Sequence, residues 1–416
     1  MRLGQFVVDV APLRASRDFR FVFAARLVSL LGIGVTGVAL SLQVFELTGS
    51  SFHVALVSLA LGGPLLAGTL AGGVLADRLD RRRLIIWSRA TAAVGFAGLW
   101  LNAMLPEPGL LTLYGCAALI GLADGLSETA LMAAVPALVG RERLAAAEAL
   151  TSTTTQLGTV AGPSAGGLLI AGPGLAACFG LTTLTTVVTI VLLCHVRPLV
   201  PARDVAAADR RPLRALVEGA RHAMRNRLIS GLILLDLCGT LFAMPYAVFP
   251  ELAAGRFEGG ATVVGLLYSA PATGALLAAL TSGWVAGVRR PGRWLIGAVA
   301  LWGLAMVCFG VSGELWLALL FLAASGVGQV ISEVLAGALL QGNTPDHLLG
   351  RVSSLWLTEA TVGPAVGNVI AGGLARVLSP AGAVVAGGLA CLAGVAWLAL
   401  AVPELRRARP LTDAAA

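Results

Sequence analysis

The chain has 416 residues, of which 57% are hydrophobic and only 12% charged, and its mean hydropathy is +0.87. A soluble domain carries about twice this charged fraction, so the composition excludes an ordinary soluble protein and favours a polytopic helical membrane protein. All 29 basic residues behind the net charge of +7 are arginines, since the sequence has no lysine, and most of them fall at the ends of apolar runs. This distribution indicates membrane topology rather than nucleic-acid binding.

Twelve apolar runs are long enough to cross a bilayer, which takes about twenty helical residues. A hydrophilic segment divides them, and we therefore predict an all-α polytopic membrane protein with 12 transmembrane helices in two pseudo-symmetric six-helix bundles. The predicted domains are an N-terminal bundle at 1–196, a cytoplasmic central loop at 197–227, and a C-terminal bundle with a short cytoplasmic tail at 228–416. The predicted spans are 21–45, 52–76, 84–105, 110–138, 144–171, 174–196, 228–251, 262–287, 293–312, 315–340, 352–375 and 380–402.

The arginines predict the orientation of these spans. If both termini are cytoplasmic, nearly all arginine clusters fall on the cytoplasmic side, as the positive-inside rule requires. Only Arg256 and Arg376 then fall outside. We therefore expect a multi-pass protein of the cell membrane with both termini in the cytoplasm. The first twenty residues include Arg14, Arg17, Asp18 and Arg20 without an apolar core, so no cleavable signal peptide is expected.

The two predicted bundles share three sequence patterns, which indicates an internal duplication. A duplicated six-helix unit is typical of secondary transporters that rock around a substrate site between the halves. The corresponding segments are Gly73–Asp77 and Gly283–Gly287, each followed by arginines, Gly121 to Glu128 and Gly326 to Glu333, and Gly162-Pro163 and Gly363-Pro364.

The end of the second predicted span resembles motif A of the major facilitator superfamily. The matching residues are Gly73, Leu75, Ala76, Asp77, Arg78, Arg81 and Arg82, while Asp80 replaces the usual second glycine and predicts a less flexible turn. The glycine predicts a close approach of two helices. The resemblance implies that Asp77 contacts the N-terminus of the helix near Gly350 in one rocked state and acts as a conformational gate. The alternative is a basic loop that only sets topology.

The fifth predicted span resembles motif C of the same superfamily, which is associated with antiporters that export their substrate. The matching residues are Gly158, Gly162, Pro163, Gly166 and Gly167. Proline predicts a kink, and the glycines predict a flat face that packs against the eighth span. Ordinary close packing is the alternative. Other phrases, such as Phe242-Ala-Met-Pro, resemble the enterobactin-exporter-like branch of drug:proton antiporters.

Five acidic residues lie deep inside predicted spans, where ionisable groups are costly and indicate function. They are the proton-coupling candidates Asp236, Glu128, Asp124, Glu333 and Glu359, of which Asp236 and Glu128 are ranked first. Burial favours the neutral form of a carboxyl group, so such a group can take up and release a proton. The alternatives are a polar patch along a water-filled cavity or a structural partner for Arg26.

Arg26, Phe242 and Gln329 are predicted to line the substrate cavity, although Arg26 could instead snorkel to the surface. The sequence contains no nucleotide-binding or catalytic motif and no metal-ligand spacing, so we expect neither an enzyme nor a cofactor or metal. We predict a monomeric transporter that exports amphipathic small molecules, either drug-like compounds or a siderophore, in exchange for protons. Its partners would be substrate, protons and lipid, without nucleic acid. Two alternatives stay open, namely a nutrient importer or facilitator of the same fold and a non-transporting membrane receptor.

Overall fold

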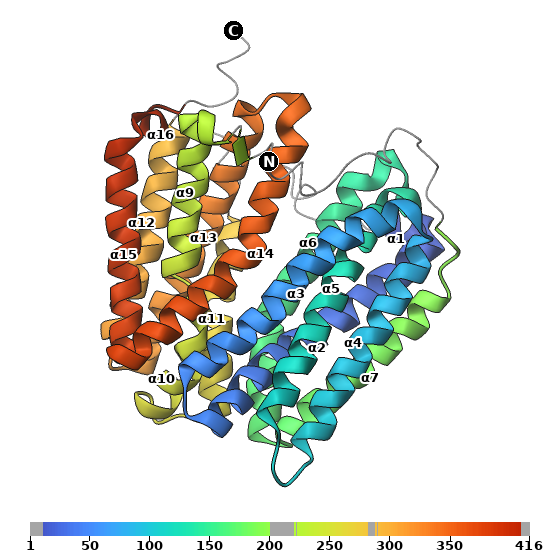
Figure 1. Cartoon of the computed structure of the whole chain (residues 1–416). Helices are drawn as coiled ribbons and strands as arrows, with labels where there is room; N and C mark the ends of the chain where they lie inside the picture. Colours follow the sequence, from blue (N-terminus) through green and yellow to red (C-terminus); the bar gives the residue numbers. More distant parts are fainter. Residues whose placement is uncertain (1–10, 200–219, 222, 282–287, 289, 409–416) are drawn as a thin grey trace. The chain divides into compact units, whose positions relative to one another are not determined.

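Each predicted apolar run overlaps a long helix in the computed structural model of the chain, which describes residues 11–199, 220–221, 223–281, 288 and 290–408 (Figure 1). The long helices are α2 (Arg17–Thr48), α3 (Ser51–Arg78), α4 (Arg81–Ala103), α5 (Leu110–Val139), α6 (Leu144–Ala171), α7 (Leu175–Cys194), α9 (Arg227–Phe242), α11 (Ala261–Leu280), α12 (Pro291–Val311), α13 (Leu315–Asn343), α14 (Asp346–Val377) and α15 (Pro380–Ala401). The short helices are α1 (Ala11–Ala15), η2 (Arg141–Arg143), η4 (Tyr246–Val248), α10 (Phe249–Gly255) and α16 (Pro403–Arg407).

Ten helical stretches of the described chain are long and apolar enough to cross a membrane, with α9 to α10 counted as one stretch over Arg227–Gly255. The chain is thus a multi-pass membrane protein. Helices α6 and α14 are not among the ten, because threonine, serine and charged residues interrupt them, as in the run Thr151–Thr155 of α6. A count of twelve spans therefore stays a proposal.

The chain forms two compact units, which are described separately below. The second unit includes the turn between α2 and α3, which contacts α10 and α14. There, the Ser51 hydroxyl donates a hydrogen bond to Glu251, and the guanidinium of Arg376 lies 4.7 Å from the ring centroid of Phe52. The first unit comprises residues 1–43 and 60–208, and the second comprises residues 44–59 and 209–416.

Glycines allow the same kind of close helix contact in both units. In the first unit, a β-carbon at Gly121 of α5 would clash with the carbonyl oxygen of Leu61 on α3. In the second unit, a β-carbon at Gly326 of α13 would clash with the carbonyl oxygen of Pro271 on α11. Small residues let membrane helices approach to backbone contact, and the duplicated sequence pattern thus corresponds to a duplicated packing contact.

The predicted single span that begins the second bundle is interrupted, which the apolar pattern did not indicate. Helix α9 ends before Pro245, a residue that lacks an amide proton and disfavours helical geometry in its predecessor. Side chains replace the missing helical hydrogen bonds. Trp302 Nε1 donates to the carbonyl of Ala243 at 2.9 Å, and Asn368 Oδ1 accepts from the amide of Ala247 at 2.9 Å. Such breaks occur at membrane depth only where protein satisfies the backbone.

Candidate functional site

Four charged side chains meet in the interior of the first unit. Arg26 of α2 lies 3.3 Å from Glu128 of α5. Arg89 of α4 lies 3.0 Å from Asp124 and 3.9 Å from Glu128, which are one helical turn apart on α5. Arg26 also donates to the hydroxyl of Thr155 at 3.4 Å. Two positive and two negative groups therefore balance in this cluster, which we call the paired cluster.

Arg89 belongs to this cluster but was not among the sequence candidates. Its side chain is only 6% exposed, and it lies about two turns into α4. An arginine inside an apolar run is costly in a bilayer, so the position of Arg89 in the sequence could have identified it as a candidate. Arg26 does not extend to the surface, which was the alternative for this residue. Its side chain is 16% exposed and pairs with Glu128.

Three carboxyl groups gather in the second unit, and we call them the acidic cluster. Asp236 of α9, Glu333 of α13 and Glu359 of α14 lie close enough to influence one another electrostatically, and Asp236 is 6% exposed. Glu359 Oε1 accepts a hydrogen bond from the Thr240 hydroxyl at 2.6 Å. Glu333 Oε1 accepts one from the amide of Gln329 at 3.0 Å.

Within the described part of the chain, no cation is paired with the acidic cluster. None of the ion pairs among the described residues includes Asp236, Glu333 or Glu359. The second oxygen of Glu359 is buried and accepts no hydrogen bond from a donor in the described chain. A proton on the neighbouring carboxyl of Asp236 would supply that donor. The described residues contain no group of three or more His, Cys, Asp or Glu side chains placed to hold a metal ion.

The predicted cavity residues lie in both units. Arg26 is in the paired cluster, Gln329 contacts the acidic cluster, and Phe242 is the last residue of α9 before its break. The structure describes each residue within its own unit, so a cavity that all three share stays a prediction.

The basic residues of the segment that resembles motif A join four helices of the first unit. Arg81 donates to the carbonyl of Ala133 on α5 at 2.6 Å and to that of Ala76 on α3 at 3.1 Å. Arg82 of α4 donates to the last carbonyl of α7, that of Cys194, at 2.6 Å, where a cation favours the helix dipole. Asp80, which replaces the usual glycine, caps α4 by accepting from the Arg82 amide at 3.0 Å.

The other residues of this segment lie on an open face of α3. Gly73, Asp77 and Arg78 are exposed, and Asp77 forms no ion pair among the described residues. The close approach predicted for Gly73 falls instead on Gly72, where a β-carbon would clash with the Thr129 hydroxyl; one at Gly73 would meet open space. Neighbouring helical residues point about 100° apart, so only one of them can face α5. The echo at 283–287 lies outside the described residues, and the Asp77 gate stays a prediction.

The glycines that resemble motif C form a stripe on α6 that packs against α2. A β-carbon at Gly158 would lie 2.8 Å from Cβ of Leu30, and one at Gly162 would lie 2.7 Å from Cα of Gly34. Gly166 continues the stripe, Gly167 is buried beside it, and α6 remains helical through Pro163. The sequence predicts that this stripe packs against the eighth span, and that contact stays a prediction.

The second unit has the equivalent contact between α14 and α9. A β-carbon at Gly363 would lie 2.9 Å from the hydroxyl of Thr240, and one at Gly367 would clash with the Thr240 carbonyl. This contact brings α14 close enough for Glu359 to reach Thr240. The glycine stripe thereby positions one member of the acidic cluster.

Comparison with known proteins decides the family. The family described as transmembrane secretion effectors, within the major facilitator superfamily, matches residues 7–412 of the chain. The chain belongs to this family. It is 37% identical over 413 residues to enterobactin exporters EntS from Shigella boydii serotype 18 and Escherichia coli O81 (strain ED1a), which covers 98% of this chain and 97% of each relative. The superfamily assigned from motifs A and C is thus confirmed.

Solved structures of transporters share the fold. A POT family transporter in complex with 5-aminolevulinic acid matches 94% of this chain and 97% of its own, with a TM-score of 0.74 and 13% identity. A mutant of the nucleoside transporter NupG matches 92% of this chain and 99% of its own, with a TM-score of 0.70 and 12% identity. This member of the major facilitator superfamily is therefore a membrane transporter by fold and family.

Proposed function

We propose that the protein exports an amphipathic siderophore, of the class to which enterobactin belongs, in exchange for protons. The relatives named enterobactin exporters match the chain over nearly its whole length, which supports both the substrate class and the direction of transport. The stripe of glycines that resembles motif C supports exchange rather than uptake. Drug-like compounds remain within the proposed substrate range.

The observation that carries the proton part of the proposal is the acidic cluster of the second unit. Two carboxylates about 4 Å apart repel each other by about 4 kcal/mol at an effective dielectric constant of 20. Three neighbouring carboxyl groups that have no cation among the described residues, and of which Asp236 is buried, therefore favour at least one neutral member. The hydrogen-bond partners of the cluster, Thr240 and Gln329, are uncharged. We therefore assign the exchangeable proton to Asp236 and Glu359, with Glu333 as the third member.

The paired cluster is less suited to carry the proton. Glu128 and Asp124 each face an arginine, and a facing cation stabilises the ionised carboxylate. We assign this cluster a structural role within the first unit. Glu128, which the sequence ranked first together with Asp236, is therefore a weaker candidate for the proton carrier than Asp236.

The proposed cycle is alternating access of two six-helix bundles across twelve spans, with both termini cytoplasmic. In this cycle, proton uptake by the acidic cluster on the outer side and proton release on the inner side each accompany one change of state. Asp77 is proposed as a conformational gate on the cytoplasmic side, and the protein is proposed to act as a monomer.

Everted membrane vesicles that hold an acidic interior and a pH-sensitive dye test the proposal. Enterobactin added outside should enter the vesicles and raise the interior pH. Asp236→Asn and Glu359→Gln should reduce both signals more than tenfold. The matched control is Glu314→Gln, an exposed acid before α13 that should leave both signals intact.

The outcomes also separate the alternatives. Enterobactin flux without a change of dye signal would indicate a facilitator and contradict proton exchange. Flux only into right-side-out vesicles would indicate an importer. Absence of flux with saturable binding would indicate a receptor.

A further inference from the structure

The chain that leaves α7 toward the central segment packs along the first unit over residues 195–199, which we call the strap. Val196 is buried, and Leu199 packs against the core cluster to which Val196 belongs. The ring of His195 stacks on that of Phe21 of α2, with 5.3 Å between the ring centroids. Connecting segments ordinarily run over the surface with few contacts, so the strap is an unusually well-packed start of a connector.

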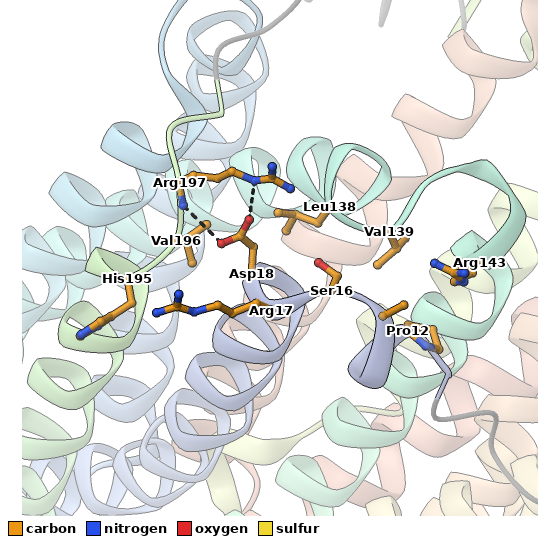
Figure 2. A pocket seen from close by; sticks show the side chains of 11 residues that line it. Pro12, Ser16, Arg17, Asp18, Leu138, Val139, Arg143, His195, Val196 and Arg197 are labelled. Carbon is orange, nitrogen blue, oxygen red and sulfur yellow. Dashed lines mark hydrogen bonds and ion pairs between the residues drawn. The ribbon is translucent and has the colours of Figure 1, made fainter.

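Asp18, in the first turn of α2, holds the middle of the strap. Its carboxylate accepts hydrogen bonds from Nε of Arg197 at 2.5 Å and from the Arg197 amide at 3.4 Å, the two dashed lines in Figure 2. Asp18 is itself buried. It therefore holds both the backbone and the side chain of Arg197 from a fixed position.

Asp80, at the turn between α3 and α4, holds the end of the strap. Its Oδ1 accepts a hydrogen bond from the Leu199 amide at 3.0 Å, and the Arg81 amide donates to the Leu199 carbonyl at 3.2 Å. The first amides of a helix have no acceptor within it, so the start of α4 offers this donor. Asp80 stands where motif A usually has a glycine, which has no side chain to make such a contact.

The two aspartates take the backbone amides of the strap that α7 does not. The amides of His195 and Val196 donate to carbonyls in the last turn of α7. Pro198 has no amide proton, so the remaining amides are those of Arg197 and Leu199, and each donates to one aspartate. Every backbone donor of the strap is thus paired within the first unit.

We propose that Asp18 and Asp80 anchor the strap, so that the connector between the two halves is held by the turn before α4 and not by α7 alone. The consequence for transport rests on the proposed function, in which the halves change position and the connector links them. A pull on the connector then acts on the turn that carries Asp80, three residues after the proposed gate Asp77. Asp80 is thereby a positioning residue of this turn.

Hydrogen–deuterium exchange of the full-length protein in detergent micelles tests the anchor, with mass spectrometry of overlapping fragments that cover 195–199. Slow exchange is expected at the amides of Arg197 and Leu199 in the wild-type protein. Asp80→Gly, which introduces the residue usual in motif A, should speed exchange at Leu199 about tenfold or more, and Asp18→Ala should do so at Arg197. Asp80→Asn keeps an oxygen acceptor and should have a smaller effect. The matched control is Arg83→Gln, an exposed side chain of the same turn, which should leave both amides slow.

The same measurement separates the anchor from a role of Asp80 as cap of α4 alone. Fast exchange at Arg197 and Leu199 in the wild-type protein would overturn the proposal. Exchange at Leu199 that stays slow in Asp80→Gly would also overturn it, because another group would then hold the strap. Faster exchange confined to the first turn of α4 in that variant would reduce Asp80 to a cap.

Transport by the variants in the everted vesicles tests the consequence. Asp80→Gly and Leu199→Pro should each slow enterobactin transport about fivefold or more, the lower end of ordinary coupling between two sites, whereas Arg83→Gln should not. Leu199→Pro removes the amide donor and leaves Asp80 in place to cap α4. Full transport by variants whose strap exchanges fast would overturn the role of the anchor in transport. A wild-type protein that does not transport enterobactin would contradict the proposed function, and the exchange measurement then decides the anchor on its own.

Discussion

Replacement of Arg89 by methionine tests whether pairing holds the paired cluster together. Arg89 lies 3.0 Å from Asp124 and 3.9 Å from Glu128, so its loss leaves two carboxylates that face one cation, Arg26. Removal of one partner from a buried pair costs about 3–5 kcal/mol of unfolding free energy. This cost has a ceiling, because a carboxyl group that ordinarily titrates near 3.9 can take up a proton at pH 7 for about 4 kcal/mol.

The compensating change is Asp124→Asn, which removes one negative charge. The double variant again has one cation, Arg26, and one carboxylate, Glu128, which remain 3.3 Å apart in the native structure. We therefore expect both single variants to be destabilised and the double variant to lose about 2 kcal/mol less than their sum. For a unit of this size, the single changes correspond to a fall of about 6–20 °C in Tm.

Thermal unfolding in detergent micelles at pH 7 and pH 5 measures these effects. The loss of unfolding free energy in Arg89→Met should be smaller at pH 5 than at pH 7, because protonation of the uncompensated carboxylate then costs only about 1.5 kcal/mol. The matched control is Arg83→Met, whose side chain is 80% exposed and pairs with Asp80 at 3.9 Å, so it should change stability by less than about 1 kcal/mol. The pairing argument would be refuted if the double variant lost as much stability as the two single variants together. It would also be refuted if Arg89→Met lost the same stability at both pH values.

Three further changes test other parts of the structure. Gly162→Ala should lower Tm and transport, because its β-carbon would lie 2.7 Å from Cα of Gly34, whereas Gly115→Ala, which meets open space, should do neither. Trp302→Phe removes the indole donor at the break in α9 and should cost about 1–3 kcal/mol in unfolding experiments; an unchanged Tm would contradict that role. Asp77→Asn should insert and fold normally but transport enterobactin poorly in vesicles, and full transport would reduce the segment to a topology signal.

The two units use equivalent helices in different ways. Glu128 and Glu333 are corresponding residues of the duplicated pattern, yet Glu128 pairs with two arginines, whereas Glu333 accepts a hydrogen bond from the uncharged amide of Gln329. An acid that is neutralised by arginine stabilises a fixed arrangement, while acids without a cation respond to protons. In the proposed function, this difference gives each half of the transporter a separate task.

The positions of the helices and the family were readable from the sequence. Apolar length sets where a helix can lie in a bilayer, and glycine, proline and arginine at set spacings mark its ends and its repeats, so α2 to α7 and α11 to α15 overlap their predicted ranges. These properties act within about twenty consecutive residues. Five acids were also identified as candidates, because a charge inside an apolar run is visible without any partner.

Only the tertiary structure decided which of those charges are compensated. Arg89 reaches Asp124, and Thr240 reaches Glu359, across contacts between different helices, over sequence separations of 35 and 119 residues. The choice of Gly72 over Gly73 likewise depends on which side of α3 faces α5. Composition and periodicity describe one helix at a time, whereas pairing depends on the rotation and separation of two helices, and these follow from packing. For this protein, the same packing separates a structural acid from one proposed to carry a proton.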